Sequence, residues 1–269
     1  MKITVVSGSR ADLGLLEWPL HVMAQDSFFA GQLVKIWGAS FAQAFDHITK
    51  RLEDERPDVM MILGDRYEIL AAATAAHLLR VPIAHIGGGD VTEGSYDDAM
   101  RDAISRMATV HFVTSTSAMA RLSHMGYRNV HLVGNPGIDY IRNAPWRGER
   151  PIAEPYVVVA YYPETIDGTV DIEAVRTAIE GRNAVWISPN NDRGSERIPE
   201  GRTFPHAEFL NLLAHCEEFI GNSSAMLYEA PELGIKTRMI GRRQRGRTIP
   251  MGDGQASLRI ANILKHIAI

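Results

Sequence analysis

Cysteine is almost absent from this sequence: Cys216 is the only one among 269 residues. A single cysteine excludes an internal disulfide framework and any zinc site built from cysteine ligands. We therefore expect a chain that folds in a reducing compartment.

Long hydrophobic runs and a strong excess of one charge are also missing. No apolar stretch approaches the roughly 20 residues that a helix needs to span a bilayer. The apolar run after Met1 is too short for a signal peptide and predicts a buried first strand instead. The net charge of −4 provides no overall attraction to nucleic acids or anionic membranes. We expect a soluble cytoplasmic protein with no membrane partner.

Short apolar runs rich in β-formers alternate with longer amphipathic stretches in the first half. This alternation predicts a parallel sheet covered by helices on both faces. The predicted strands are Ile3–Ser7, Gln32–Trp37, Val59–Leu63, Ile83–Ile86, Val110–Thr114 and Val130–Val133. The predicted helices are Leu13–Gln25, Phe41–Glu55, Glu68–Leu79, Tyr96–Met107 and Ser117–Met125.

A polar stretch with Pro and Gly, Asn143–Pro151, predicts a linker before a second alternating set. The strands expected there are Tyr156–Ala160, Ala184–Ile187, Glu218–Ile220 and Thr237–Ile240, with helices near Asp171–Glu180, Glu208–Ala214 and Ala225–Leu233. The domains expected are residues 1–142, a linker at 143–152, and residues 153–269. The last helix, Ala256–His266, is a candidate to return to the first domain. The fold class predicted is α/β, with two Rossmann-like domains facing each other across a cleft.

The segment from Ile220 to Gly234 suggests a nucleotide site. An apolar run ends at Gly221, and Ser223 and Ser224 then stand where a helix would begin, a location that attracts anions such as a diphosphate. Glu229, about one and a half helical turns on, could accept the hydroxyls of a ribose. The alternative is an ordinary helix cap followed by a solvated Glu.

Four further loops follow predicted strands. They are Gly8–Gly14 with Arg10, Gly64–Arg66 with Asp65, His85–Gly94 with Asp90, and Asn190–Ser195. Each has a structural alternative: a lone Asp such as Asp65 often caps a helix, and Asp97 and Asp98 could interact with a helix dipole. Because all these loops lie at the strand ends where ligands bind in such folds, we expect a site there.

Together these motifs resemble the UDP-N-acetylglucosamine 2-epimerase family, including its sialic-acid-pathway branch. The resemblance is densest in Gly8–Leu16, Gly64–Arg101, His111–Asp139, Ser188–Ser195 and Gly221–Arg247. It implies the two-domain GT-B fold and a UDP-sugar as substrate, with no further cofactor. It also implies that UDP is held by Arg10, Asn190, Asn191, Asp192, Ser223, Ser224 and Glu229. The catalytic candidates it implies on the sugar side are Asp65, Asp90, Asp97 and Arg101.

Several positions depart from the family pattern. The chain is shorter than members of the family, and a long loop after the second strand is missing. Tyr162 stands where the family has a His before Pro, and Asp102 follows Arg101 in place of a His. Gly87 stands where branches of the family have a Glu or a His. Histidine suits proton transfer near neutral pH, whereas a tyrosine with a pKa near 10 does not.

These departures leave three functional hypotheses. The first is a UDP-sugar-dependent glycosyltransferase that transfers a hexose to a hydroxyl acceptor. Hydroxymethylated viral DNA, met by the basic Arg238–Arg247 segment, is one candidate acceptor. The second is a hydrolysing or non-hydrolysing UDP-N-acetylglucosamine 2-epimerase, and the third is an inactive nucleotide-sugar-binding protein. No metal site is expected, the histidines are expected to be core or surface residues, and a homodimer is one candidate assembly.

Overall fold

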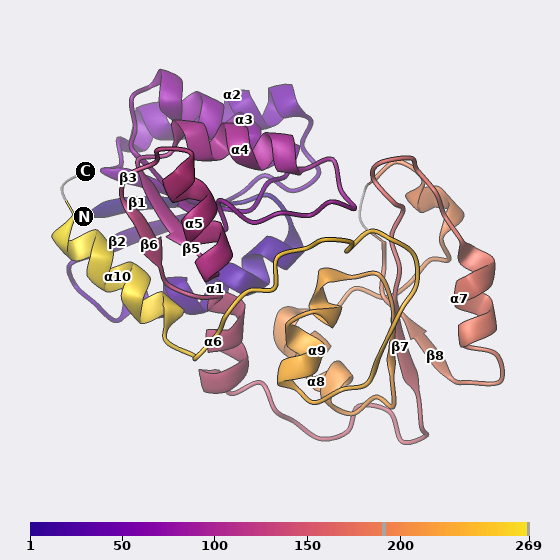
Figure 1. Ribbon diagram of the computed structural model, residues 1–269. Helices are drawn as coiled ribbons and strands as arrows, with labels where there is room; N and C mark the ends of the chain where they lie inside the picture. Colours follow the sequence, from indigo (N-terminus) through magenta and orange to yellow (C-terminus); the bar gives the residue numbers. More distant parts are fainter. Residues whose placement is uncertain (190–191, 268–269) are drawn as a thin grey trace. The chain divides into compact units, whose positions relative to one another are not determined.

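The computed structural model describes residues 1–189 and 192–267. The chain divides into two compact units (Figure 1). Unit 1 comprises Met1–Val91, Asp97–Asn143 and Pro250–Ile269, and unit 2 comprises Thr92–Tyr96 and Ala144–Ile249. The C-terminal segment lies in unit 1, to which the last helix was a candidate to return. Five residues between two elements of unit 1 lie in unit 2, which the expected domain bounds did not include.

Unit 1 is built on a six-stranded, fully parallel sheet in the order β2-β1-β3-β4-β5-β6. The strands are β1 (Lys2–Ser7), β2 (Ala30–Lys35), β3 (Val59–Leu63), β4 (Ile83–Ile86), β5 (Val110–Val113) and β6 (Val130–Leu132). The helices are α1 (Arg10–Ala24), α2 (Phe41–Glu55), α3 (Tyr67–Leu78), α4 (Asp98–Met107), α5 (Thr116–His124), α6 (Pro136–Asn143) and α10 (Ala256–His266).

Helices cover both faces of this sheet, as the alternation of elements predicts. Residues of α1 and α10 pack on one face, where Val5, Met61 and Phe112 are buried. Residues of α2, α3 and α4 pack on the other face, where Val6 and Ile62 are buried. The alternation of side chains along each strand therefore feeds two separate cores.

Unit 2 has a four-stranded parallel sheet in the order β10-β9-β7-β8. Its strands are β7 (Val157–Ala160), β8 (Ala184–Trp186), β9 (Phe219–Gly221) and β10 (Thr237–Met239). Its helices are α7 (Ile172–Ala178), α8 (His206–Ala214) and α9 (Glu229–Glu232), with 3₁₀ turns η1 (Ser195–Arg197) and η2 (Ser224–Met226). Residues of α8, η2 and α9 pack on one sheet face and Val175 of α7 on the other.

One sequence-based expectation for a helix is wrong. The helix expected over Ala225–Leu233 is split into η2 and α9. Pro231 explains the split: in a continuous helix it would be an interior residue without an N–H, whereas in α9 it lies in the first turn, where proline is tolerated. Helix α6 is not among the helices expected from the sequence.

The location of α10 depends on a buried carboxylate of α6. Asp139 is fully buried, and its two carboxylate oxygens accept hydrogen bonds from the backbone N–H groups of Ala256 (3.1 Å) and Ser257 (2.5 Å). A carboxylate at a helix N-terminus satisfies donors that the helix itself leaves unpaired. The last helix is therefore anchored in unit 1.

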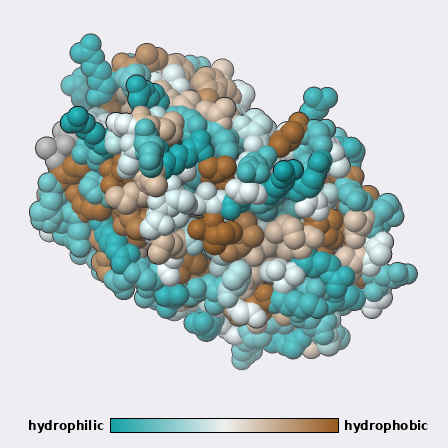
Figure 2. Space-filling view, viewed as in Figure 1, coloured by the Kyte–Doolittle hydropathy of each residue, from teal (hydrophilic) through white to brown (hydrophobic). Residues whose placement is uncertain are grey.

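The surface in view is mixed in character. Figure 2 shows hydrophobic residues in separate areas among hydrophilic ones. Within residues 1–189 and 192–267, no helix is long and apolar enough to cross a membrane.

Candidate functional site

The order of strands reverses at one place in each sheet. In unit 1 the reversal lies between β1 and β3, and in unit 2 between β7 and β9. In open α/β sheets, ligands bind at the carboxyl ends of the strands beside such a reversal. The segments there are Gly8–Arg10 and Gly64–Arg66 in unit 1, and Tyr161–Glu164 and Gly221–Ser224 in unit 2.

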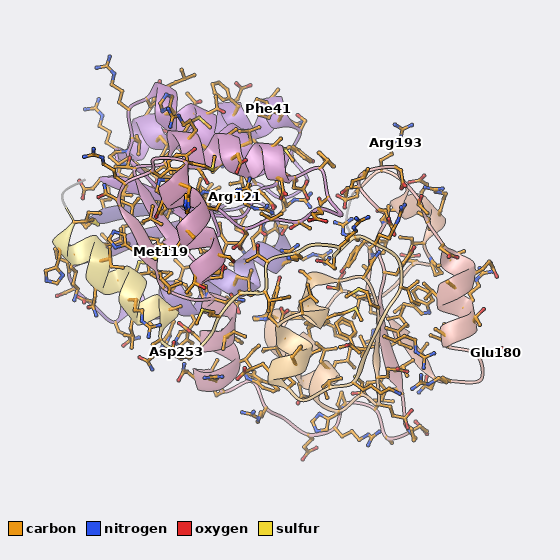
Figure 3. All side chains as sticks on the ribbon, in the orientation of Figure 1. Phe41, Met119, Arg121, Glu180, Arg193 and Asp253 are labelled. Atoms are coloured by element: carbon orange, nitrogen blue, oxygen red, sulfur yellow. The ribbon has the colours of Figure 1, made fainter. Side chains whose placement is uncertain are left out.

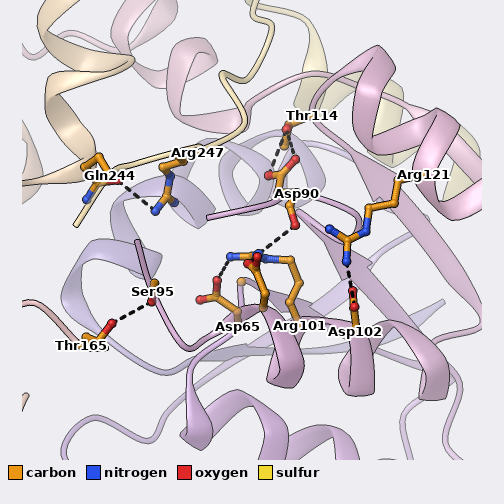
Figure 4. Close-up of polar contacts among 12 residues, drawn as sticks. Asp65, Asp90, Ser95, Arg101, Asp102, Thr114, Arg121, Thr165, Gln244 and Arg247 are labelled. Carbon is orange, nitrogen blue, oxygen red and sulfur yellow. Dashed lines mark hydrogen bonds and ion pairs between the residues drawn. The ribbon is translucent and has the colours of Figure 1, made fainter. Parts of the chain in front are cut away.

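Arg101 is the centre of a charged cluster in unit 1 (Figure 4). Its side chain is only 3% exposed, and its guanidinium forms ion pairs with Asp65 and Asp98. The same group donates to the backbone carbonyl of Asp90 (2.8 Å). Burial by itself lowers the pKa of Arg101, but the charges of Asp65, Asp98 and Asp90 raise it above its ordinary value. The guanidinium thus stays charged and fixes three acidic segments at one sheet edge.

Asp90 is also held through its carboxylate. The Thr114 hydroxyl donates to both of its oxygens, at 3.0 and 3.2 Å. Asp97 is the N-cap residue of α4 and makes no capping hydrogen bond with its side chain. The structure therefore brings Asp65, Asp90 and Arg101 together and adds Asp98, which the sequence reading treated only as a helix-dipole residue. Its spacing of three residues from Arg101 on one helix is the signal that identifies it.

Arg10 and Asp12 lie in the first turn of α1. Arg10 is exposed, and the Ser9 hydroxyl caps the helix by accepting from the Asp12 N–H (3.2 Å). One carboxylate oxygen of Asp12, Oδ2, is buried without a hydrogen-bond partner among the described residues. Burial raises the pKa of Asp12 to about 7, against the opposing effects of Arg66 and Ser9. Sequence reasoning missed Asp12, since a helix-start aspartate ordinarily lies in solvent.

His85, on β4, has a structural role. Its Nε2 lies 2.8 Å from the carbonyl oxygen of Gly64, which can only accept, so Nε2 carries the proton; Nδ1 lies 3.1 Å from the Ser105 hydroxyl. Burial lowers the pKa of His85 to about 4. The neutral ring therefore ties the loop after β3 to β4 and α4.

In unit 2, Asn222 links the loops that follow β7 and β9. Its side-chain oxygen accepts from the Tyr162 N–H, and its side-chain nitrogen donates to the Tyr162 carbonyl, both at 2.8 Å. The next residue, Ser223, caps η2 by accepting from the Ala225 N–H (3.3 Å), and Ser224 is the first residue of that turn. The two serines thus lie at the sheet reversal, although the continuous helix expected after them is absent.

Glu229 is the first residue of α9 and is 8% exposed. Its Oε2 is buried with no hydrogen-bond partner in the described part of the chain. Burial raises the pKa of Glu229 to about 7, although His206 and Arg247 act in the opposite direction. A buried oxygen that lacks a partner is an acceptor available to a ligand.

The Gly241–Arg247 segment, which we call the arginine turn, packs on the loop after β7. Arg242 donates from its backbone N–H to buried Glu164 (2.5 Å) and pairs with Asp167 through its side chain. Arg243 binds the Pro163 carbonyl (2.5 Å) and the carboxylate of Asp192 (2.9 Å). Asp192 therefore contacts this turn, while Asn190 and Asn191 lie outside the described residues.

The three departures from the family pattern are placed as follows. Gly87 has a left-handed backbone (φ 85°), and a side chain there would begin 3.8 Å from an Asp90 carboxylate oxygen. Asp102 forms an ion pair with Arg121 at 2.9 Å (Figure 4). Arg121 belongs to α5 and is labelled in Figure 3. Tyr162 has the Arg243 guanidinium 5.5 Å from its ring centroid.

The described residues contain no group of three or more His, Cys, Asp or Glu side chains arranged to hold a metal ion. In the Arg101 cluster the acidic groups instead surround a guanidinium.

Comparison with known proteins connects this geometry to one family. The sequence profile for UDP-N-acetylglucosamine 2-epimerase matches residues 34–250. The UDP-N-acetylglucosamine 2-epimerase of Neisseria meningitidis serogroup B is 30% identical over 236 residues, 78% of this chain and 62% of that protein. A Legionella pneumophila protein named UDP-N,N'-diacetylbacillosamine 2-epimerase (hydrolyzing) is 31% identical over 238 residues, 77% of this chain and 63% of that protein. The chain thus spans less than two thirds of the length of these relatives.

Solved structures show the same fold. The Methanocaldococcus jannaschii UDP-GlcNAc 2-epimerase in complex with UDP-GlcNAc and UDP matches with a TM-score of 0.78 at 17% identity, covering 99% of this chain and 100% of that one. The Staphylococcus aureus MnaA–UDP co-structure matches with a TM-score of 0.81 at 15% identity, covering 98% and 96%. The fold is therefore α/β with two parallel sheets, of the GT-B type. Because the profile match extends over most of both units, the chain belongs to the UDP-N-acetylglucosamine 2-epimerase family.

Proposed function

We propose that this chain is a 2-epimerase of the hydrolysing type, which converts a UDP-linked 2-acetamido sugar into UDP and the free C2 epimer. The observation that carries the proposal is the Arg101 cluster, in which a buried guanidinium fixes Asp65, Asp98 and the Asp90 backbone at the carboxyl edge of the sheet. Relatives from Legionella and Campylobacter are named as hydrolysing 2-epimerases, which supports this choice over transfer.

The reaction begins with loss of the proton on C2. The electron pair of the C2–H bond forms a C1=C2 double bond as the C1–O bond breaks and UDP leaves with its electrons. Water then adds to this double bond: its oxygen bonds to C1 as the water gives up one proton, and C2 receives a proton on the opposite face. Both proton transfers need a positioned acid or base.

Among the carboxylates, Asp90 is our candidate for the base. Asp65 and Asp98 form ion pairs with Arg101, and the Asp90 carboxylate is held in place by the Thr114 hydroxyl, which donates to both of its oxygens. Arg101 holds these groups, and Asp97 is the remaining candidate at the start of α4. In this proposal carboxylates perform proton transfer without the family histidines, and no cofactor is needed.

For the nucleotide we propose Arg10, Asp192, Ser223, Ser224 and Glu229 as contacts, together with Asn190 and Asn191. Support comes from Glu229, whose buried Oε2 lacks a partner among the described residues and can accept from a ribose hydroxyl. Ser223 and Ser224 follow β9 at the strand reversal, which is where such folds bind nucleotides.

Glycosyl transfer is the second candidate, and one observation favours it. Asp102, at the position of a family His, is bound to Arg121, so a proton-transfer group is missing there. The DNA acceptor has less support than the sequence suggested. Four arginines of the Arg238–Arg247 segment are already paired with carboxylates of unit 2, namely Arg238, Arg242, Arg243 and Arg245.

NMR of the protein with UDP-GlcNAc in D₂O tests these alternatives. Epimerisation is expected to release UDP and free ManNAc carrying deuterium at C2, and Asp90→Asn is expected to lower this rate by about a thousandfold. Acceptor-dependent release of UDP with the C2 proton retained would instead establish transfer. UDP-sugar binding without turnover would leave only the nucleotide-binding role.

A further inference from the structure

The Thr92–Tyr96 segment belongs to unit 2, although it joins β4 and α4 of unit 1. Thr92 is 2% exposed, and the Ser95 N–H donates to the Thr92 carbonyl (2.9 Å), which closes the segment into a tight turn. Asp90 precedes this turn by two residues, and Asp97 and Asp98 follow it directly. The turn is thus placed between the acidic groups of the proposed active site.

Gly94 packs directly on the arginine turn. Its N–H donates to the Arg245 carbonyl (3.0 Å). A Cβ at Gly94 would lie 2.1 Å from the Arg242 carbonyl oxygen and 2.6 Å from that of Arg243. Gly94 is not among the residues with a positive φ, so a left-handed backbone is not what requires glycine here. The need for glycine here is therefore one of space.

Two side-chain contacts strengthen the same attachment. The Thr165 hydroxyl lies 3.0 Å from the Ser95 hydroxyl (Figure 4). Glu93 pairs with Arg245 at 3.6 Å, and a Cβ at Gly246 would lie 2.4 Å from the Glu93 side chain. The turn is thus held by backbone, hydroxyl and charge together.

The arginine turn is in contact with the proposed nucleotide loops as well. The Gln244 side chain donates to the carbonyl of Asn222 (2.8 Å), which directly precedes Ser223, and Arg243 binds Asp192. The Arg247 guanidinium in turn lies 3.3 Å from the Gln244 side-chain oxygen. A continuous set of contacts therefore connects Asn222, Gln244, the carbonyls of Arg242 and Arg245, and Gly94.

We propose that Gly94 is a positioning residue: by packing on the arginine turn, it fixes the turn that joins Asp90 to Asp97 and Asp98 along the chain. This inference rests on the proposed function for the identity of the reaction. Gly94 itself contacts no reacting atom. Because Gly94 has no side chain, its backbone packs directly on the arginine turn. In this proposal a bound nucleotide orders the arginine turn through Asn222.

Gly94→Ala tests the proposal. The extra methyl cannot fit against two backbone carbonyls, so the turn must shift, and a shift of about 1 Å at the catalytic carboxylates lowers the kcat for C2 deuteration by about 100-fold. The Kd for UDP, measured by calorimetry, is expected to stay unchanged. Gly31→Ala is the matched control, because a Cβ there meets nothing within 4 Å. An unchanged kcat, or a parallel loss of kcat and UDP affinity, overturns the proposal.

Thr165→Val provides a second variant in case Gly94→Ala fails to fold. It removes one hydroxyl contact with the turn at nearly constant volume, and we expect about a tenfold loss of kcat, again without loss of UDP affinity. An unchanged kcat in this variant counts against the proposal.

Amide hydrogen exchange separates this inference from the proposed function. If the wild type shows no turnover, the epimerase proposal fails, but the Gly94 amide should still exchange slowly, and more slowly with UDP bound. Fast exchange of that amide in the wild type, or no effect of UDP, overturns the positioning role whatever the reaction is.

Discussion

Tyr162 and Asn222 are joined by two hydrogen bonds of 2.8 Å that run in opposite directions between one side chain and one backbone unit. Tyr162 lies beyond the end of β7, and the Asn222 side chain supplies the two hydrogen bonds that a neighbouring strand would otherwise make with its backbone. Because Asn222 directly precedes Ser223, this contact sets the geometry of the proposed nucleotide loop. Tyr162, which stands where the family has a histidine, therefore has a structural role through its backbone.

Replacing Asn222 should destabilise unit 2 strongly. Asn222→Ala removes the two hydrogen bonds that its side chain makes with the Tyr162 N–H and carbonyl, at a cost of about 2–4 kcal/mol in the free energy of unfolding. Asn222→Asp should cost a similar amount, since its carboxylate faces the Tyr162 carbonyl where a donor is needed. Urea unfolding measures both effects. Asn183→Ala, at an exposed position, is the control; equal stability of all three variants would contradict the predicted role.

Arg101 should contribute strongly to stability. Arg101→Met removes the partner of two carboxylates from a site where the guanidinium is 3% exposed, and we expect a loss of about 3–5 kcal/mol. Arg176→Met provides the comparison, because that pair with Glu173 is exposed and should contribute under about 1 kcal/mol. A Tm that falls no further for Arg101→Met than for Arg176→Met would exclude a structural role for the cluster.

The pH dependence of stability should show the burial of Glu229. Burial raises its pKa to about 7 from the ordinary 4.5, so between these values the folded state holds a proton that the unfolded state has lost. Its contribution to stability therefore falls as pH rises from about 4.5 to 7 and is constant above. Glu229→Gln should be more stable than the wild type by about 3 kcal/mol at pH 8 and equal to it near pH 4. Denaturant titrations at the two pH values give the difference; identical differences at both would refute the assignment.

His85 should show the opposite pH dependence. Its pKa is lowered to about 4 from 6.5, so between these values the unfolded state binds the extra proton. The stability that His85 contributes is present above pH 6.5 and is lost as pH falls towards 4, by about 3 kcal/mol. Nitrogen-15 NMR at pH 6 should find a neutral ring with the proton on Nε2. A charged imidazolium at that pH would contradict the hydrogen bonding described for Gly64 and Ser105.

Much of the fold can be predicted from local patterns in the sequence. The alternation of apolar and amphipathic runs determines the order of strands and helices, since each strand buried on both faces must be uniformly apolar. Gly8, Gly64 and Gly221 then mark the strand ends where site residues belong. The edge strand β2 was displaced by two residues in the prediction, because Trp37 leaves the ladder and donates from its indole to the Ser7 hydroxyl (3.0 Å).

The amino-acid sequence by itself determined the family, the two parallel sheets and the loops that carry Asp65, Asp90 and Ser223. Only the tertiary structure decided that Arg101 joins Asp65 to Asp98, that Asp139 caps α10 from 117 residues away, and that Thr92–Tyr96 belongs to unit 2. The physical reason is the separation along the chain over which the interactions act. Periodicity and turn residues report the preferences of neighbouring residues, whereas these contacts depend on burial of charge and on packing between segments that meet only after folding.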